Sequence, residues 1–194
     1  MVECDLPVRY ETGLIASHWV FRGSRNAPKI EEGAKVMNIL KWILSLAVGG
    51  FLIMMGITKF TGGAHIFPLI EMQASGLGFP MADLFFPLVN YATGTLEVVA
   101  GALVILPQTR AKIGAPLAVL PFLGAVVFHV SPLLGVVTPN GYAEGAEGLE
   151  AALAAGSGFT PEHFTAEAGP ALFAMAAGFL LLAIINFALH RRDA

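Results

Sequence analysis

The stretch LFFPLVNYATGTLEVVAGALVIL, residues 84–106, is apolar over a length sufficient to cross a bilayer. After Thr95 its only polar side chain is that of Glu97. An ionised carboxylate at such a depth costs roughly 3 kcal/mol on insertion scales, so Glu97 requires a partner or a proton. Two interpretations follow: a functional group inside the membrane, or a protonated or threonine-bonded glutamate that only holds helices together.

Three more segments have the same character. Apolar residues make up 56% of the 194 residues and charged residues only 13%, which is unlike an ordinary soluble domain. We therefore predict an all-α integral membrane protein, a bundle of four transmembrane helices within a single domain. The domain covers residues 37–192, and its expected spans are 37–57, 84–106, 114–137 and 170–189.

The basic residues predict the orientation of this bundle. Ten of the eleven fall in segments that share one side of the membrane, and only Lys59 falls on the other. The positive-inside rule makes that side cytoplasmic and places both termini there. No basic groove or motif for nucleic acid is present. The ten are Arg9, Arg22, Arg25, Lys29, Lys35, Lys41, Arg110, Lys112, Arg191 and Arg192.

Residues 1–36 differ from the rest because they are polar and lack periodicity, which predicts a cytoplasmic tail. A second hypothesis is that the natural start is Met37 and the tail is a start-site artefact. Glu31-Glu32-Gly33 must be encoded by a purine-rich run that resembles a ribosome-binding site just before that methionine. The only cysteine, Cys4, lies in the tail, so thiol chemistry in the membrane domain is excluded.

The outer links are long enough to contain short helices. In the first, we expect a helical run after Pro68 that ends at Gly76 and lies along the membrane interface. In the last, the Ala- and Glu-rich residues 144–155 predict another helix. Thr160, Pro161 and Glu162 have the residue types of an N-cap, N1 and N2.

One stripe of the second span combines small and polar residues. Asn90, Gly94, Glu97 and Gly101 recur at helical spacing, with Thr93 beside them. Such a stripe permits close helix approach and polar contacts between helices. Asn90, Thr93 and Glu97 are therefore candidates for binding a cofactor.

His129 is the second ionisable group expected inside the apolar region. It is a candidate, with Glu97, for a proton relay, a hydrogen bond to a quinone or an axial haem ligand. Haem is disfavoured because no second histidine lies at a comparable depth. His65 and His163 approach from the outer links without tight ligand spacing, so no metal site is predicted. The structural alternative is a histidine bonded to a neighbouring carbonyl.

Lys59 ends the first span. We favour an interface-anchoring lysine over one that folds inward to pair with Glu71, Asp83 or a bound anion. In the inward case Lys59 joins the cofactor-binding candidates.

Short motifs resemble the DoxX-like family: GITKF at 56–60, GTLEVVAG at 94–101 and PQTR at 107–110. His129 and the closing ALHRR at 188–192 are also similar. The resemblance covers residues 37–192 and implies a four-helix protein of the bacterial inner membrane. It further implies relatives in thiosulfate–quinone oxidoreduction or other membrane redox assemblies, with Lys59, Glu97 and Arg110 as recurring polar sites.

Two function classes follow from these features. The first is a subunit of, or accessory to, a quinone-linked redox system, working with a soluble or membrane redox protein. The alternative is a non-catalytic membrane partner or assembly factor that docks another protein through its outer links. A small-solute permease ranks third, because four short-linked spans rarely form a transporter unless the protein assembles into a homo-oligomer. No phosphate-binding loop, Ser–His–Asp set or zincin motif is present, so no enzymatic reaction is assigned.

Overall fold

Four long apolar helices dominate the computed structural model, which describes residues 27–62, 64–143 and 159–191. The chain divides into two compact units, Met1–Leu40 and Lys41–Ala194. Four helical stretches are long and apolar enough to cross a membrane, which confirms an all-α helical bundle with four candidate spans. They are Glu32–Thr61, Ala82–Ile105, Pro107–Val130 and Ala171–His190.

Helix α1 (Ala27–Thr61) belongs to both units, and its second half packs against α3 (Asn90–Ile105) through glycines. A Cβ built on Gly49 would lie 2.7 Å from the carbonyl oxygen of Gly101, and one on Gly56 would lie 2.7 Å from that of Gly94. Only glycine permits so close a backbone approach. The predicted packing stripe on the second span is therefore confirmed, and α1 supplies a matching pair seven residues apart.

The third span begins and ends about seven residues earlier than the predicted 114–137. After an extended Leu106, the chain turns at once into α4 (Pro107–Thr109), the π-helical turn η3 (Arg110–Gly114) and α5 (Ala115–Val130). Proline has a fixed φ and no N–H to lose, so Pro107 begins a helix instead of extending the link. Arg110 consequently lies within the helical span, and His129 lies in its last turn.

Helix α7 (Ala171–His190) completes the bundle and packs on α5. Phe51, Phe122 and Phe179 form a continuous aromatic contact across α1, α5 and α7, with ring centroids 3.7 Å apart for Phe51 and Phe179 and 5.6 Å apart for Phe122 and Phe179. Small buried residues such as Ala118 and Ala183 allow the helices to approach beside these rings.

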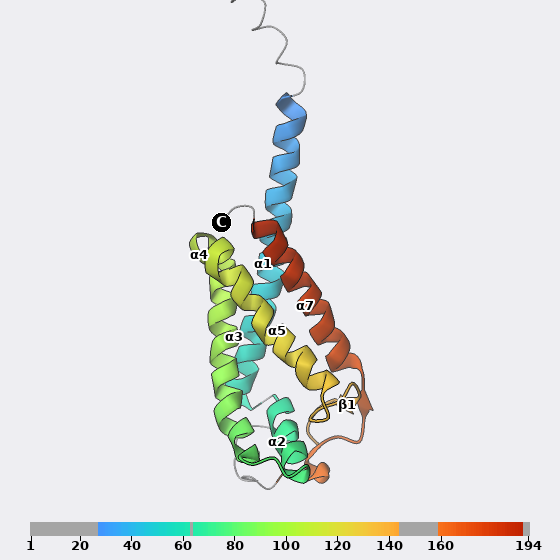
Figure 1. Ribbon diagram of the computed structural model, residues 1–194. Helices are drawn as coiled ribbons and strands as arrows, with labels where there is room; N and C mark the ends of the chain where they lie inside the picture. Colours follow the sequence, from blue (N-terminus) through green and yellow to red (C-terminus); the bar gives the residue numbers. More distant parts are fainter. Residues whose placement is uncertain (1–26, 63, 144–158, 192–194) are drawn as a thin grey trace, which may run out of the picture. The chain divides into compact units, whose positions relative to one another are not determined.

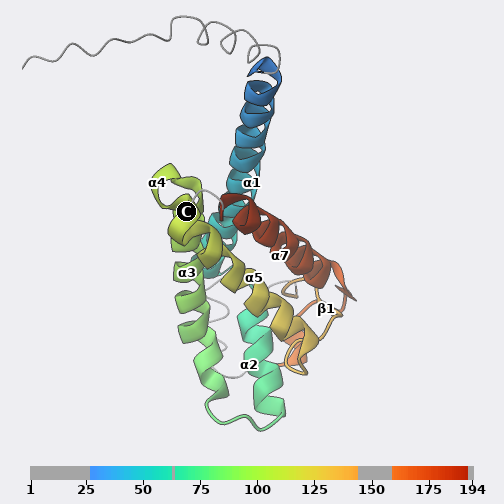
Figure 2. The same ribbon diagram turned by 45° about the horizontal axis from the view of Figure 1, so that its top comes forward.

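A small structured layer covers the end of the bundle where α1 finishes. It comprises α2 (Ile66–Gly76), the turns η1 (Ala82–Leu84) and η2 (Phe85–Val89), and the one-turn helix η4 (Pro161–His163). The strands β1 (Thr138–Pro139) and β2 (Ala168–Gly169) pair antiparallel beside them. In Figure 1 and Figure 2, α2 and β1 lie at the end of the bundle opposite α4.

The expected helix ending at Gly76 is present as α2. Phe67, Leu69 and Ile70 of α2 are at most 6% exposed and pack with Phe86 and Phe164. Helix α2 thus faces protein on its apolar side. Thr160 caps η4 as predicted, with a capping box to His163, whereas the helix expected over residues 144–155 lies outside the described residues.

Candidate functional site

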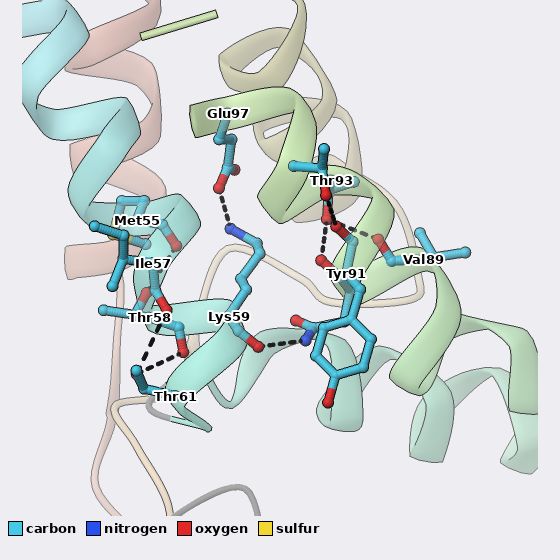
Figure 3. Close-up of polar contacts among 11 residues, drawn as sticks. Met55, Ile57, Thr58, Lys59, Thr61, Val89, Tyr91, Thr93 and Glu97 are labelled. Atoms are coloured by element: carbon cyan, nitrogen blue, oxygen red, sulfur yellow. Dashed lines mark hydrogen bonds and ion pairs between the residues drawn. The ribbon is translucent and has the colours of Figure 1, made fainter. Parts of the chain in front are cut away.

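An ion pair between Lys59 of α1 and Glu97 of α3 is the central polar contact of the bundle. Lys59 Nζ donates to Glu97 Oε2 at 2.5 Å, and the two side chains are 7% and 13% exposed. Figure 3 shows the lysine side chain extending from α1 toward the carboxylate. The prediction of an interface-anchoring lysine is therefore wrong, and the partner is Glu97 instead of Glu71 or Asp83.

Asn90 holds the end of α1 in the position that this pair requires. Its Nδ2 donates to the backbone carbonyl oxygen of Lys59 at 2.9 Å, and the residue is 1% exposed. The Thr93 hydroxyl donates to Val89 O at 2.8 Å, within its own helix, as Figure 3 also shows. Glu97 is thus bonded to lysine and not to threonine, and Asn90 is a positioning residue behind the site.

The ion pair faces a cavity of about 340 Å³ between α1, α2, α3, α5 and α7. Most of its wall is apolar, and six side chains with polar groups reach it: Thr58, Lys59, His65, Thr93, Glu97 and His129. Four of the five predicted site residues therefore meet at one cavity. The exception is Asn90.

Two histidines of the cavity wall are bonded to the loop that follows α5. His129 Nδ1 lies 2.9 Å from Gly135 O, and His65 Nε2 lies 3.0 Å from Pro139 O. A carbonyl only accepts, so these nitrogens donate; in a neutral imidazole the other ring nitrogen is then free to accept. Burial lowers the pKa of His65 against the opposing effect of its Pro139 hydrogen bond, which favours the neutral ring.

His129 thus bonds a nearby backbone carbonyl, as the structural alternative predicts, and it also lines the cavity. Among the described residues no group of three or more His, Cys, Asp or Glu side chains is placed to hold a metal ion. His163 bonds Thr160 instead of joining His65 and His129.

His65 was not among the predicted site residues. Its position in a link gave no indication of depth, yet it is 8% exposed and immediately precedes α2. Its proximity in sequence to Lys59, at the end of the first span, was the available signal.

Arg110 lies outside the cavity wall. Its Nε donates to Val104 O at 3.0 Å and its Nη2 to Ile105 O at 2.7 Å, while its guanidinium stacks 3.7 Å from the ring centre of Trp42. The residue is 5% exposed and caps the end of α3.

By length and composition, the four candidate spans of the chain are those of a multi-pass membrane protein. No family model, curated protein or solved structure matches the chain. The chemistry of the site therefore has to be inferred from the cavity itself.

Proposed function

We propose that this chain is a DoxX-like protein of the bacterial inner membrane, with both termini cytoplasmic, that serves a quinone-linked redox system as a subunit or accessory. The cavity bearing Lys59, Glu97 and His129 is the observation that carries the proposal. Its volume of about 340 Å³ lies at the small end of ligand pockets and suits a single ring-sized head group.

The hydrogen-bonding capacity of the wall supports an oxygen-bearing ring. Lys59 has three N–H donors and uses one on Glu97, which leaves donors for a quinone carbonyl. His129 donates through Nδ1 to Gly135, so its Nε2 can accept from the hydroxyl of the reduced form. A wall with a donor and an acceptor accommodates both redox states of a quinone.

The route of entry is suggested by the apolar surface of the bundle. Leu120 of α5 lines the cavity and is 54% exposed, so the cavity wall extends to the surface that lipid would cover. A lipid-soluble molecule is a better fit to that position than a charged solute.

The test is equilibrium binding of a short-chain quinone to the purified protein in lipid nanodiscs. Lys59→Met removes the donor that would bond the quinone, and Glu97→Gln removes the charged partner that holds this donor in place, so each is expected to weaken saturable binding by about tenfold or more. Thr95→Val is the matched control, since Thr95 is exposed on α3 and its hydroxyl donates to Tyr91 O within the same helix. Equal affinity in all four proteins, or no saturable binding, would refute the proposal.

The alternative, a non-catalytic protein that docks a partner at its outer end, is favoured by one observation. Leu77, Phe79 and Met81, between α2 and η1, are 53%, 48% and 66% exposed. Phe79→Ser with Met81→Ser would then abolish partner co-purification from native membranes, and Glu97→Gln would not. The redox proposal predicts that Glu97→Gln weakens quinone binding and that Phe79→Ser with Met81→Ser leaves it unchanged.

A further inference from the structure

Glu71 of α2 is buried without a hydrogen-bonding partner. The residue is 1% exposed, and neither carboxyl oxygen has a partner among the described residues. It lies on the helix that covers the end of the bundle, outside the four candidate spans. Glu71 belongs neither to the Lys59–Glu97 ion pair nor to the residues that line the cavity.

A carboxylate in this position strongly favours its neutral form. An ionised acid that loses its water and gains no donor is destabilised far more than the uncharged acid. Burial, followed by the nearby Asp83 carboxylate, raises the pKa of Glu71 to about 7. The described packing therefore suits the protonated side chain better than the ionised one.

The same helix forms one wall of the cavity. Ile66, Phe67 and Ile70 of α2 line it, and His65 precedes the helix on the same wall. Glu71 follows Ile70 directly and lies one turn beyond Phe67. A displacement of Glu71 toward water thus moves residues that line the cavity.

We propose that Glu71 is a proton-binding site that controls this wall. With its proton bound, α2 packs against η1 and η2 and the cavity end is closed. Loss of the proton places an unpaired charge in an apolar contact, and α2 moves outward to solvate it. This proposal rests on the proposed function in one respect: the quinone head group is the ligand of the cavity that α2 covers.

Few other titratable groups surround Glu71 in the described part of the chain. Asp83 on η1 disfavours its ionisation, whereas η2 contributes no titratable side chain. Lys59 approaches the ring of Phe67 at 5.8 Å and is already paired with Glu97. The remaining groups around the apolar cluster of α2 are His65, Tyr142 and His163.

Thiol labelling of α2 tests the proposal. Cys4 is the only cysteine, so a Cys4→Ser background permits single-cysteine variants of the full chain. Ala74→Cys reports on a buried position of α2 and Gln73→Cys on an exposed one. The labelling rate of the first divided by that of the second is expected to rise about tenfold between about pH 6 and pH 8, following ionisation near pH 7.

Glu71→Gln provides the decisive comparison, because it keeps the shape and cannot ionise. In that variant the ratio is expected to stay low at both pH values. A flat ratio with Glu71 present, or the same rise with Glu71→Gln, overturns the proposal. Leu69→Cys, at a position 2% exposed, repeats the measurement should Ala74→Cys fail to fold.

Infrared spectroscopy gives an independent measurement on the unlabelled protein. A protonated-carboxyl C=O band that titrates near neutral pH and vanishes in Glu71→Gln supports the proposal, and its absence at about pH 6 overturns it. Neither measurement uses a quinone. A failure of the ligand proposal is therefore distinguishable from a failure of this one.

Discussion

The bond between Lys59 and Glu97 explains how two charged side chains persist inside an apolar bundle. Each is largely removed from water, with side chains 7% and 13% exposed, and each is the other's counterion. In a medium of low dielectric constant such a pair attracts strongly, but either charge alone is unfavourable. The pair therefore stabilises the bundle only as a unit.

Single substitutions in this pair are expected to be more destabilising than removing both charges. Lys59→Met or Glu97→Gln should each lower the free energy of unfolding by about 3–5 kcal/mol, because an uncompensated buried charge remains. The double variant should be more stable than either single variant. Denaturant unfolding in detergent, arranged as a double-mutant cycle, measures the coupling. Additive effects of the two substitutions would contradict a coupled pair.

At the scale of secondary-structure elements, the α1–α3 contact depends on the absence of side chains at two levels. Gly49→Ala and Gly56→Ala each place a methyl group 2.7 Å from a backbone carbonyl oxygen of α3. Helices must separate to admit it, at about 1–3 kcal/mol. Gly50→Ala is the control because nothing lies within 4 Å of its Cβ, and the better helix propensity of alanine should stabilise it by up to about 1 kcal/mol. Thermal unfolding of the three variants checks this order, and equal melting temperatures would contradict it.

The end of α3 depends on Arg110 in a way that lysine cannot reproduce. The planar guanidinium bonds two carbonyl oxygens and stacks on Trp42 at once. Arg110→Lys keeps the charge but loses this fork, so we expect a loss of about 1–3 kcal/mol in unfolding free energy. Lys112→Arg, at an exposed site in the same turn, is the control. A stability of Arg110→Lys equal to that of the parent would show that charge alone is sufficient.

The sequence predicted the elements that periodicity and hydropathy report. The four apolar helices, the stripe of α3 with Gly94 and Gly101, and the Thr160 cap all follow from local spacing and residue type. The direction of the Lys59 side chain did not, because a lysine at a span boundary can extend outward or inward without changing the pattern. Only the juxtaposition of α1 and α3 decides between them.

The burial of α2 was missed for a related reason. Glu71 within an apolar run is typical of an interfacial amphipathic helix, but here the glutamate is buried with its neighbours. The predicted bounds of the third span were about seven residues too late, because Arg110 was expected in a link. In the structure the Arg110 side chain caps the end of α3. Tertiary contacts outweighed the local signal for α2, whereas the earlier start of the third span follows from Pro107 at the first position of α4.

At the scale of the whole chain, the charge distribution predicts orientation. Arg110 and Lys112 lie at the α4 end of the second unit, and acidic residues such as Asp83 of η1 and Glu162 of η4 lie at its α2 end. A green fluorescent protein fused to the C-terminus is expected to fluoresce in a bacterial host. Alkaline phosphatase inserted after Gly78, in the exposed link between α2 and η1, is expected to be active. The reverse pattern of reporter activity would contradict the proposed orientation.

We propose that a quinone head group binds in the cavity that holds Lys59 and Glu97. Photoaffinity labelling with an azido-quinone, followed by peptide mapping by mass spectrometry, tests it most directly. The cavity lining predicts modification within residues 64–70 and 93–97, suppressed by excess unlabelled quinone. Modification confined to exposed positions of α7 such as Leu181 and Ile184, or unaffected by competitor, would contradict it.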